Sequence, residues 1–306
     1  MIHHVFANRS NVGDWLSARG IQNLLRPERV VEHFCDDPFV PETLDHLSRL
    51  GPEDLVVIGG GGLFMDYFIP FWEGFLRLAP RLRYCIWGVG YCDLKDEPSP
   101  PEREILERVV GGSRYSVVRD DLSLRHLENC ALPAPVPCPS MVAVRCEPMG
   151  SGLLHVDNYT TVGAAAYDSM DRHCRDFAAR TGRVYRRTNN RIDPPTEPRL
   201  GLCLERYSRS DLVVSSALHG CVIAVAMGRP VVAVSGDYKI ESFMEAAGLG
   251  EWVVDAAEVE KVPALLERLS SQPLRLDFAA RARAENEGVA RRVKEVAAET
   301  AFEHHV

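Results

Sequence analysis

Short apolar runs alternate with amphipathic stretches along the chain, and this alternation is the strongest signal in the sequence. Four runs in the first half have the length and the β-branched or aromatic content of buried strands: residues 1–7, 54–58, 82–87 and 115–118. Helical spacing of apolar residues occurs at about residues 14–26, 66–79, 100–110 and 121–129. Strands that alternate with helices in this way predict a parallel sheet with helices on both faces.

Residues 131–152 interrupt the alternation with five prolines and two glycines, which break regular elements. Beyond them, strands are predicted at 153–157, 183–187, 211–215 and 230–234, and helices at 164–181, 200–209, 218–227, 239–247, 259–270 and 276–300. We therefore predict an N-terminal lobe of residues 1–145 and a C-terminal lobe of residues 146–306 that ends in a long helix able to cross back. Two such α/β lobes resemble the GT-B arrangement: two Rossmann-like lobes with parallel sheets and an inter-lobe cleft at the strand ends.

Composition and charge narrow the class of protein. Of the 306 residues, 46% are hydrophobic and 25% charged, which is typical of soluble globular proteins. No apolar stretch reaches the ~18 residues of a membrane span, and the N-terminus lacks signal-peptide features, so we expect a cytoplasmic protein. A net charge of −8 disfavours a nucleic-acid partner. One basic cluster surrounds Tyr185, and we interpret it as a solvated face rather than an anion site: Arg183, Arg186, Arg187 and Arg191.

Cysteines and histidines give no metal or disulfide signature. The nine cysteines are scattered, odd in number and without a C-x-x-C pair. His3, His4 and the terminal His304-His305 show no ligand spacing with an acidic partner. The sequence therefore predicts no metal site.

The first segment that can carry chemistry is Asn11-Val12-Gly13-Asp14, which follows the first predicted strand. Glycine permits a tight strand-to-helix turn, and Asn or Asp can cap the helix that comes next. Capping is the simpler interpretation of Asp14. The functional alternative places its carboxylate on the cleft floor, as a base or a hydroxyl-binding group.

Four glycines, Gly59–Gly62, follow the buried run Val56-Val57-Ile58. Without side chains, the backbone N–H groups of Gly60, Gly61 and Gly62 can approach a phosphate or carboxylate. The loop lacks the Gly-Lys-Ser/Thr of a Walker motif and the third glycine of a dinucleotide fingerprint. We favour ligand approach over a plain tight turn.

Two cationic side chains also follow strands. Arg119 ends Val117-Val118-Arg119-Asp120, and its guanidinium suits a carboxylate or phosphate. A surface pair with Asp120 or Asp121 explains it equally well. Lys239 could reach a phosphate, or it could be a solvated lysine at the start of a helix.

The segment Ser215-Ser216-Ala217-Leu218-His219-Gly220 is the most informative. A strand delivers two serines and a histidine to the start of a helix. The helix dipole disfavours the charged imidazole there, so we expect His219 to titrate near neutrality and to act as an acid or base. Ser215, Ser216 and the free N–H groups around Gly220 could hold an anion.

Taken in order, these segments resemble the polysaccharide pyruvyl transferase family. That family shows an early Asn-x-Gly-Asp, a glycine-rich loop after a strand, a Val-Arg-Asp-x-x-Ser segment and a late Ser-x-Leu-His-Gly. The matching residues here are Asn11–Asp14, Gly59–Gly62, Val118–Ser123 and Ser216–Gly220, and Gly228-Arg229-Pro230 and Lys239 continue the pattern.

The sequence departs from the family pattern at two places. Many members carry Arg before Leu-His-Gly, whereas this chain has Ala217. Many also carry Gly-Asp-Pro near the domain junction, whereas this chain has Pro137-Cys138-Pro139. One guanidinium and one carboxylate are therefore absent.

The resemblance implies a transferase that moves a pyruvyl group from phosphoenolpyruvate to sugar hydroxyls, forming a ketal in exopolysaccharide or cell-surface glycan synthesis. It implies His219 as acid/base and Asp14 as a hydroxyl-orienting base. The implied donor-binding residues are Asn11, Gly60, Gly61, Gly62, Arg119, Ser215, Ser216, Gly220 and Lys239. It implies no cofactor besides phosphoenolpyruvate as co-substrate, and a saccharide acceptor that is often lipid-linked, with transient contact at the inner membrane face.

Two other functions stay open at this point. A GT-B glycosyltransferase would take a nucleotide-sugar donor on the same fold. A non-catalytic, repurposed family member would bind a saccharide or a protein, and Ala217 and Cys138 favour it.

Overall fold

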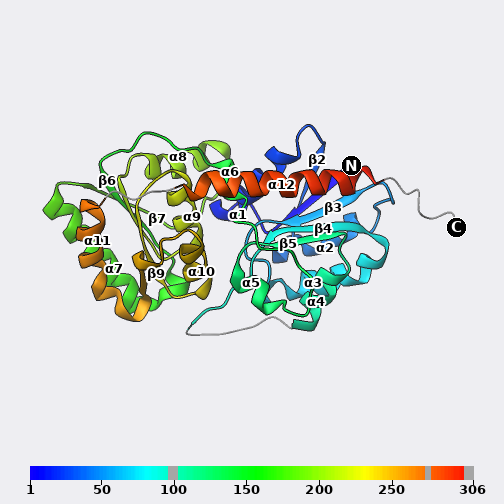
Figure 1. Ribbon diagram of the computed structural model, residues 1–306, viewed down its shortest axis with the longest axis horizontal. Coiled ribbons are helices and arrows are strands. Elements are labelled where there is room, and N and C mark those ends of the chain that lie inside the picture. Colours follow the sequence, from blue (N-terminus) through cyan, green and yellow to red (C-terminus); the bar gives the residue numbers. More distant parts are fainter. Residues whose placement is uncertain (96–102, 273–276, 300–306) are drawn as a thin grey trace.

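Two α/β lobes lie side by side in the computed structural model, which describes residues 1–95, 103–272 and 277–299 (Figure 1). Each lobe contains a five-stranded sheet, with strand orders β2-β1-β3-β4-β5 and β10-β9-β8-β6-β7 among the described residues. All strand pairs in both sheets are parallel. The predicted GT-B-like α/β class is confirmed.

The elements of the first lobe are β1 (Ile2–Phe6), α1 (Val12–Leu25), β2 (Val30–Phe34), α2 (Val40–Leu47), β3 (Leu55–Gly59), α3 (Ile69–Leu78), β4 (Arg83–Val89), α4 (Arg103–Gly111), β5 (Tyr115–Val118) and α5 (Asp121–His126). The short helix α6 (Ser140–Ala143) lies in the proline-rich connection. The predicted strands of this lobe are confirmed, but β2 was missed. It is an edge strand in which only His33 is buried, so its sequence lacks a continuous apolar run.

The elements of the second lobe are β6 (Gly152–Val156), α7 (Tyr159–Thr181), β7 (Val184–Thr188), α8 (Glu197–Ser208), β8 (Leu212–Ser215), α9 (Leu218–Ala226), β9 (Val231–Ser235), α10 (Tyr238–Ala246), β10 (Val253–Asp255), α11 (Val262–Ser271) and α12 (Phe278–Ala298). The three-residue edge strand β10 was also missed, because it is too short to show a pattern.

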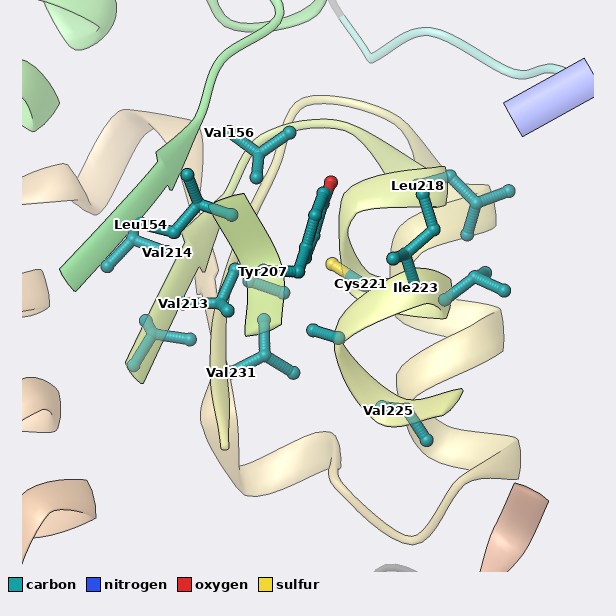
Figure 2. Close-up of a cluster of buried hydrophobic side chains, with 14 of the residues drawn as sticks. Leu154, Val156, Tyr207, Val213, Val214, Leu218, Cys221, Ile223, Val225 and Val231 are labelled. Carbon is teal, nitrogen blue, oxygen red and sulfur yellow. The ribbon is translucent and has the colours of Figure 1, made fainter. Parts of the chain in front are cut away.

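The second lobe has its core between the sheet and the helices around it. Strands β6 and β9 are buried along their whole length, and Val213 and Val214 of β8 pack in the same cluster. Figure 2 shows the Tyr207 ring of α8 among these valines, facing Cys221 of α9. This continuous apolar packing supplies the main stabilisation of the lobe.

Helix α12 crosses from the second lobe to the first (Figure 1). Its beginning packs in the second-lobe core, where the Phe278 ring meets Phe243 edge-on with centroids 5.7 Å apart. Its later residues Val289 and Val293 pack in a first-lobe cluster with Trp87. This helix and α1 cover one face of the first sheet, while α2, α3 and α4 cover the other.

A buried asparagine fixes the middle of the crossing helix. Asn286 is fully buried, and its Oδ1 accepts a hydrogen bond of 2.9 Å from Trp87 Nε1. Its Nδ2 donates to the carbonyls of Pro137 and Ala282, both at 2.8 Å. One side chain thus joins α12 to a first-sheet strand and to the connection between the lobes.

The carboxyl edges of the two sheets meet through backbone pairing. Asn11 and Arg191 form one antiparallel bridge between the lobes, and Leu94 and Asp237 form another. Beside the first bridge, Val12 N donates to the Asn190 carbonyl at 2.9 Å. We call these two bridges the main-chain clasp. Since ligands of open α/β sheets bind at the carboxyl edge, the clasp locates the site.

Asn190 connects the clasp to the second-lobe core. Its backbone is left-handed, with φ 55°, a conformation that asparagine tolerates better than most residues. Its Oδ1 accepts a hydrogen bond of 2.9 Å from the hydroxyl of buried Tyr207. Core packing therefore sets the position of the loop that meets the first lobe.

No helix in the described part of the chain combines the length and apolar character that a membrane crossing requires.

We expect Asn286→Ala to lower the free energy of unfolding by about 2–4 kcal/mol, because it leaves the Trp87 N–H and the Pro137 carbonyl without their partner. Urea unfolding followed by tryptophan fluorescence measures this change. Glu287→Ala, at an exposed position on the same helix, serves as the control. Equal stability of the two variants would contradict a stabilising role for the hydrogen bonds of Asn286.

Candidate functional site

Four ionisable side chains gather where the lobes meet. Asp14 lies in the first turn of α1, Arg119 follows β5, His219 lies in the first turn of α9, and Lys239 lies at the start of α10. Each comes just after the carboxyl end of a strand. Their charges act on one another: Arg119 and Lys239 both lower the pKa of Asp14 and of His219. The structure thus brings together four side chains that lie far apart in the sequence.

Asn11, not Asp14, caps α1. The Asn11 side chain accepts a hydrogen bond of 3.0 Å from Gly13 N, so the interpretation of Asp14 as the cap is wrong. The physical reason is register: helix α1 begins at Val12, which makes Asn11 the capping residue. Asp14 is therefore the third residue of the helix, in its first turn, and its carboxylate is available to the site.

Burial raises the pKa of Asp14 to about 7. The positive charges of Arg119, Arg191 and Lys239 oppose this rise but do not cancel it. At neutral pH this carboxyl group therefore exists in both protonation states. It can hold a proton for transfer in a range where an ordinary aspartate is fully ionised.

The glycine loop packs directly against α1. Gly60 and Gly61 have φ of 83° and 86°, which residues with a Cβ rarely adopt. A Cβ on Gly61 would overlap the Asp14 carboxylate. The Gly60 N–H is not free for a ligand, as the sequence interpretation assumed, because it donates to the Trp87 carbonyl at 3.1 Å. The loop shapes the wall beside Asp14.

Arg119 is buried, with 6% of its surface exposed. Its Nε donates to Asp120 Oδ2 at 2.9 Å, and Asp120 in turn caps α5 through Ser123 N. The expected pair with Asp120 does form, but in the interior rather than on the surface. Burial disfavours the charged guanidinium, and the Asp120 carboxylate outweighs this effect, so the pKa of Arg119 is raised.

The remaining end of the guanidinium has no protein partner. Nη2 of Arg119 is buried and makes no hydrogen bond with any described residue. A Cβ on Gly90 would overlap this group, so the glycine at that position gives it room. A buried, charged N–H without an acceptor is costly and suits an anionic ligand.

His219 of the second lobe lies against the backbone of the first. A Cβ on Gly13 would overlap the imidazole, so this contact requires glycine. Burial, Arg119 and Lys239 lower the pKa of His219 to about 3. The prediction that it titrates near neutrality is therefore wrong, because two neighbouring cations add to the burial effect. The imidazole is therefore neutral at pH 7.

Cys138 is a site residue that the sequence did not reveal as one. It is fully buried, and its Sγ lies 3.7 Å from His219 Nε2, 3.1 Å from Ser17 Oγ and 2.8 Å from Ser140 Oγ. The signal was its departure from the family pattern in the proline-rich connection. The Cys138 sulfur therefore lies beside Nε2 of the imidazole, whereas Gly13 lies beside Nδ1.

Lys239 reaches from the second lobe toward the glycine loop. Its Nζ lies 2.5 Å from Asp237 Oδ2 and 3.3 Å from Cys92 Sγ. Cys92 belongs to the first lobe and lies close to Gly62, where a Cβ would overlap its sulfur. Burial opposes the charge on Lys239, but Cys92 and Asp237 outweigh it and raise the pKa. The ammonium is therefore charged.

Ser215, Ser216 and Gly220 shape the turn that presents His219. Ser215 Oγ donates to the Ala217 carbonyl at 2.8 Å and accepts from Ala217 N at 3.1 Å. Ser216 Oγ accepts from Asn158 N at 2.8 Å, and a Cβ on Gly220 would overlap Ser215 Oγ. Both serines are fully buried, so these contacts hold the strand-to-helix connection in shape.

The arginine cluster around Tyr185 divides into two groups. Arg183 pairs with Asp211 at 3.1 Å, and Arg187 pairs with Asp157 and with Asp171, at 3.3 Å from the latter. Arg191 differs, because its positive charge acts on Asp14 across the clasp. Only Arg191 of these three belongs to the site.

Three cavities lie at or beside the site. One of about 490 Å³ lies between the lobes, lined on one side by Asp93 and Arg125 and on the other by Tyr238. One of about 250 Å³ reaches Arg119, and one of about 350 Å³ is lined by Arg191, Arg199 and Arg206. Each of the two smaller cavities is lined by a cation of the site, Arg119 in one and Arg191 in the other.

Comparisons with known proteins identify a family and a fold. The family model described as polysaccharide pyruvyl transferase matches residues 11–238. Among solved structures, UDP-GlcNAc 2-epimerase from Methanocaldococcus jannaschii aligns with TM-score 0.60 and 10% identity, covering 96% of this chain and 99% of that one. The Neisseria meningitidis UDP-GlcNAc 2-epimerase gives TM-score 0.59 and 10% identity, covering 96% and 98%. These similarities show the GT-B fold. A comparison with curated protein sequences finds no significant match.

We expect Asp14→Asn to stabilise the protein at pH 8 by on the order of 2–4 kcal/mol. The folded-state pKa of about 7 lies above the ordinary 3.8, so the contribution of Asp14 to stability is present below about pH 4 and is lost as pH rises toward 7. Asparagine does not ionise, so the variant does not lose stability in this way as the pH rises.

Thermal unfolding at pH 4.5 and pH 8 measures the effect, with Asp176→Asn on the exposed face of α7 as control. The difference in Tm between Asp14→Asn and the wild type should grow with pH. A constant difference, or a variant that is less stable at pH 8, would show that the carboxylate is not disfavoured by burial.

Proposed function

The chain belongs to the polysaccharide pyruvyl transferase family, and from this premise we propose that it transfers the pyruvyl group of phosphoenolpyruvate to two hydroxyls of a sugar, forming a ketal. The bond between the phosphate oxygen and the carbon that becomes the ketal centre breaks, and phosphate is released. The reaction needs an acid, a base and a positive site for two anionic groups.

The observation that carries this proposal is the unpaired Nη2 of Arg119, buried between the lobes. Phosphoenolpyruvate offers a carboxylate and a phosphate, and both are acceptors that match a guanidinium. Lys239 and Arg191 supply two further positive charges around Asp14. A small dianionic or trianionic donor satisfies these groups better than a neutral sugar does.

Asp14 is the group we assign as the acid. With a pKa of about 7 it carries a proton in a large share of molecules at neutral pH. That proton would go to the methylene carbon of phosphoenolpyruvate and create an oxocarbenium-like centre. This assignment reverses the role that the resemblance implied for Asp14, because burial makes the protonated form accessible.

His219 is the group we assign as the base. Its imidazole is neutral, so it can accept the proton of a sugar hydroxyl as the oxygen attacks the cationic carbon. Two of the three causes that lower its pKa are Arg119 and Lys239. A bound anionic donor would screen both cations and raise the basicity of the ring. Loss of phosphate and attack by a second hydroxyl then close the ketal.

The acceptor would enter through the cavity of about 490 Å³ between the lobes. We propose a saccharide, and the family resemblance extends this to a lipid-linked one, with transient contact at a membrane surface. As written, the reaction calls for no metal and no cofactor beyond phosphoenolpyruvate.

A second candidate is glycosyl transfer from a nucleotide sugar, which the shared GT-B fold with UDP-GlcNAc 2-epimerases favours. Those similarities lie at 10% identity, so they support the fold and leave the donor open. A repurposed, non-catalytic binder is the third candidate, favoured by Ala217 and Cys138.

We expect phosphoenolpyruvate to raise the Tm by several degrees at about 100 times its Kd. Arg119→Gln should abolish the shift, because the variant loses the charged fork that binds the donor. Arg114→Gln, at an exposed position in the same lobe, should retain it. A shift with UDP-GlcNAc alone would make glycosyl transfer the leading function.

We expect His219→Gln and Gly13→Ala each to reduce phosphate release from phosphoenolpyruvate, in the presence of sugar acceptors, by about 100-fold or more. The first variant removes the base, and the second introduces a Cβ where the imidazole lies. Gly201→Ala, where a Cβ meets open space, should leave the rate unchanged. Unchanged rates in both site variants would contradict the assigned role of His219.

A further inference from the structure

Three histidines from three elements of the first lobe meet at one place. His3 lies on β1, His33 on β2 and His46 on α2. Each contributes a ring nitrogen, and these nitrogens all lie within 4.8 Å of one another. In the parallel register of β1 and β2, Val5 pairs with His33, so His3 and His33 are two positions apart on the same face. Helix α2 brings His46 over that face.

The rings contact each other closely. His3 Nδ1 lies 3.1 Å from His33 Nε2, and the two rings stack with centroids 5.3 Å apart. The His46 ring lies 4.4 Å from that of His33 and 5.3 Å from that of His3, centroid to centroid. His3 and His33 are buried, with 5% and 9% of their surface exposed, while His46 is exposed. The cluster therefore has one side open to solvent.

The Asp54 carboxylate lies near Nε2 of His3. His3 Nε2 lies 3.6 Å from Asp54 Oδ1, and the same oxygen lies 3.3 Å from the Met1 amino group. The other nitrogen of His3 faces the remaining two rings. Histidines that bind metals very often direct their second nitrogen to a carboxylate, which orients the ring.

We propose that His3, His33 and His46 form a binding site for a divalent transition metal such as Zn²⁺, with His3 ligating through Nδ1 and His33 through Nε2. Tetrahedral zinc with Zn–N bonds of about 2.0–2.1 Å requires nitrogens about 3.3 Å apart, so small rotations of the rings suffice. A water molecule on the open side completes four-fold coordination. The three-imidazole set suits Zn²⁺, Co²⁺, Ni²⁺ or Cu²⁺ and does not suit Mg²⁺ or Ca²⁺.

The protonation states favour binding. Burial lowers the pKa of His33 to about 4, and it also lowers the pKa of His3. Both rings are neutral at pH 7, so neither must release a charge-carrying proton to bind a metal. One of the two nitrogens carries the proton between the rings. When the metal binds, that proton moves to the other nitrogen of the same ring, so that both facing nitrogens offer a lone pair.

The site is separate from the one between the lobes. His3 is the second residue of β1, near the amino edge of the sheet, whereas Asp14 and the glycine loop follow carboxyl ends. We infer a stabilising role: the metal joins β1, β2 and α2, and so supports the edge strand β2. The proposal does not depend on the function proposed above.

The test uses the full chain without an affinity tag, carrying His304→Gln and His305→Gln so that the terminal histidines cannot bind metal. After dialysis against a chelator, the protein is titrated with Zn²⁺ in competition with a chromophoric chelator, and with Co²⁺ to record the visible absorption of four-coordinate cobalt. We expect one equivalent of Zn²⁺ and a Tm raised by several degrees. Mg²⁺ should produce neither effect.

Two variants connect the binding to these residues. His46→Gln changes an exposed side chain, so the metal-free variant should keep the wild-type Tm while its Zn²⁺ affinity falls at least about ten-fold. His173→Gln, in the second lobe beside Glu260, should bind like the wild type. The absence of saturable binding up to about 100 μM Zn²⁺, or unchanged affinity in His46→Gln, would overturn the site and leave the three rings as a packed cluster.

Discussion

The contact between Gly13 of one lobe and the His219 imidazole of the other is the constraint on which the site depends. No side chain can intervene there, because a Cβ on Gly13 would occupy the ring position. The same condition recurs at Gly61, which leaves room for Asp14, and at Gly90, which leaves room for Arg119. The three glycines therefore allow His219, Asp14 and Arg119 to pack against the backbone within one site.

This shared site determines the chemistry. The pKa of Asp14 is raised to about 7 and that of His219 is lowered to about 3, and both shifts favour the neutral form of the side chain. Arg119 and Lys239 keep their charges because each has a carboxylate beside it, Asp120 and Asp237. The result is a site with fixed positive charge, a neutral imidazole and a carboxyl group that is partly protonated at pH 7, which is the combination that the proposed reaction requires.

Much of this arrangement was predictable from the sequence, and the reasons for the failures are physical. Apolar runs that end in small or polar residues predict the buried strands, the glycine loop and the segment around His219. The edge strand β2 lacks such a run, because only His33 of its residues is buried. Asp14 was assigned as a cap because pattern alone does not fix helix register. Cys138 and the three clustered histidines were missed, because they come from separate elements that only the folded chain brings together.

The main-chain clasp has a consequence for how such a protein can diverge. The bridges at Asn11–Arg191 and Leu94–Asp237 are made by backbone atoms, which every residue except proline can supply. The backbone pairing itself therefore places no demand on side chains, although Asn11, Arg191 and Asp237 each have a further role through their side chains. Positions near the bridges that lack such a role can therefore vary while the two lobes keep the same arrangement around the charged groups.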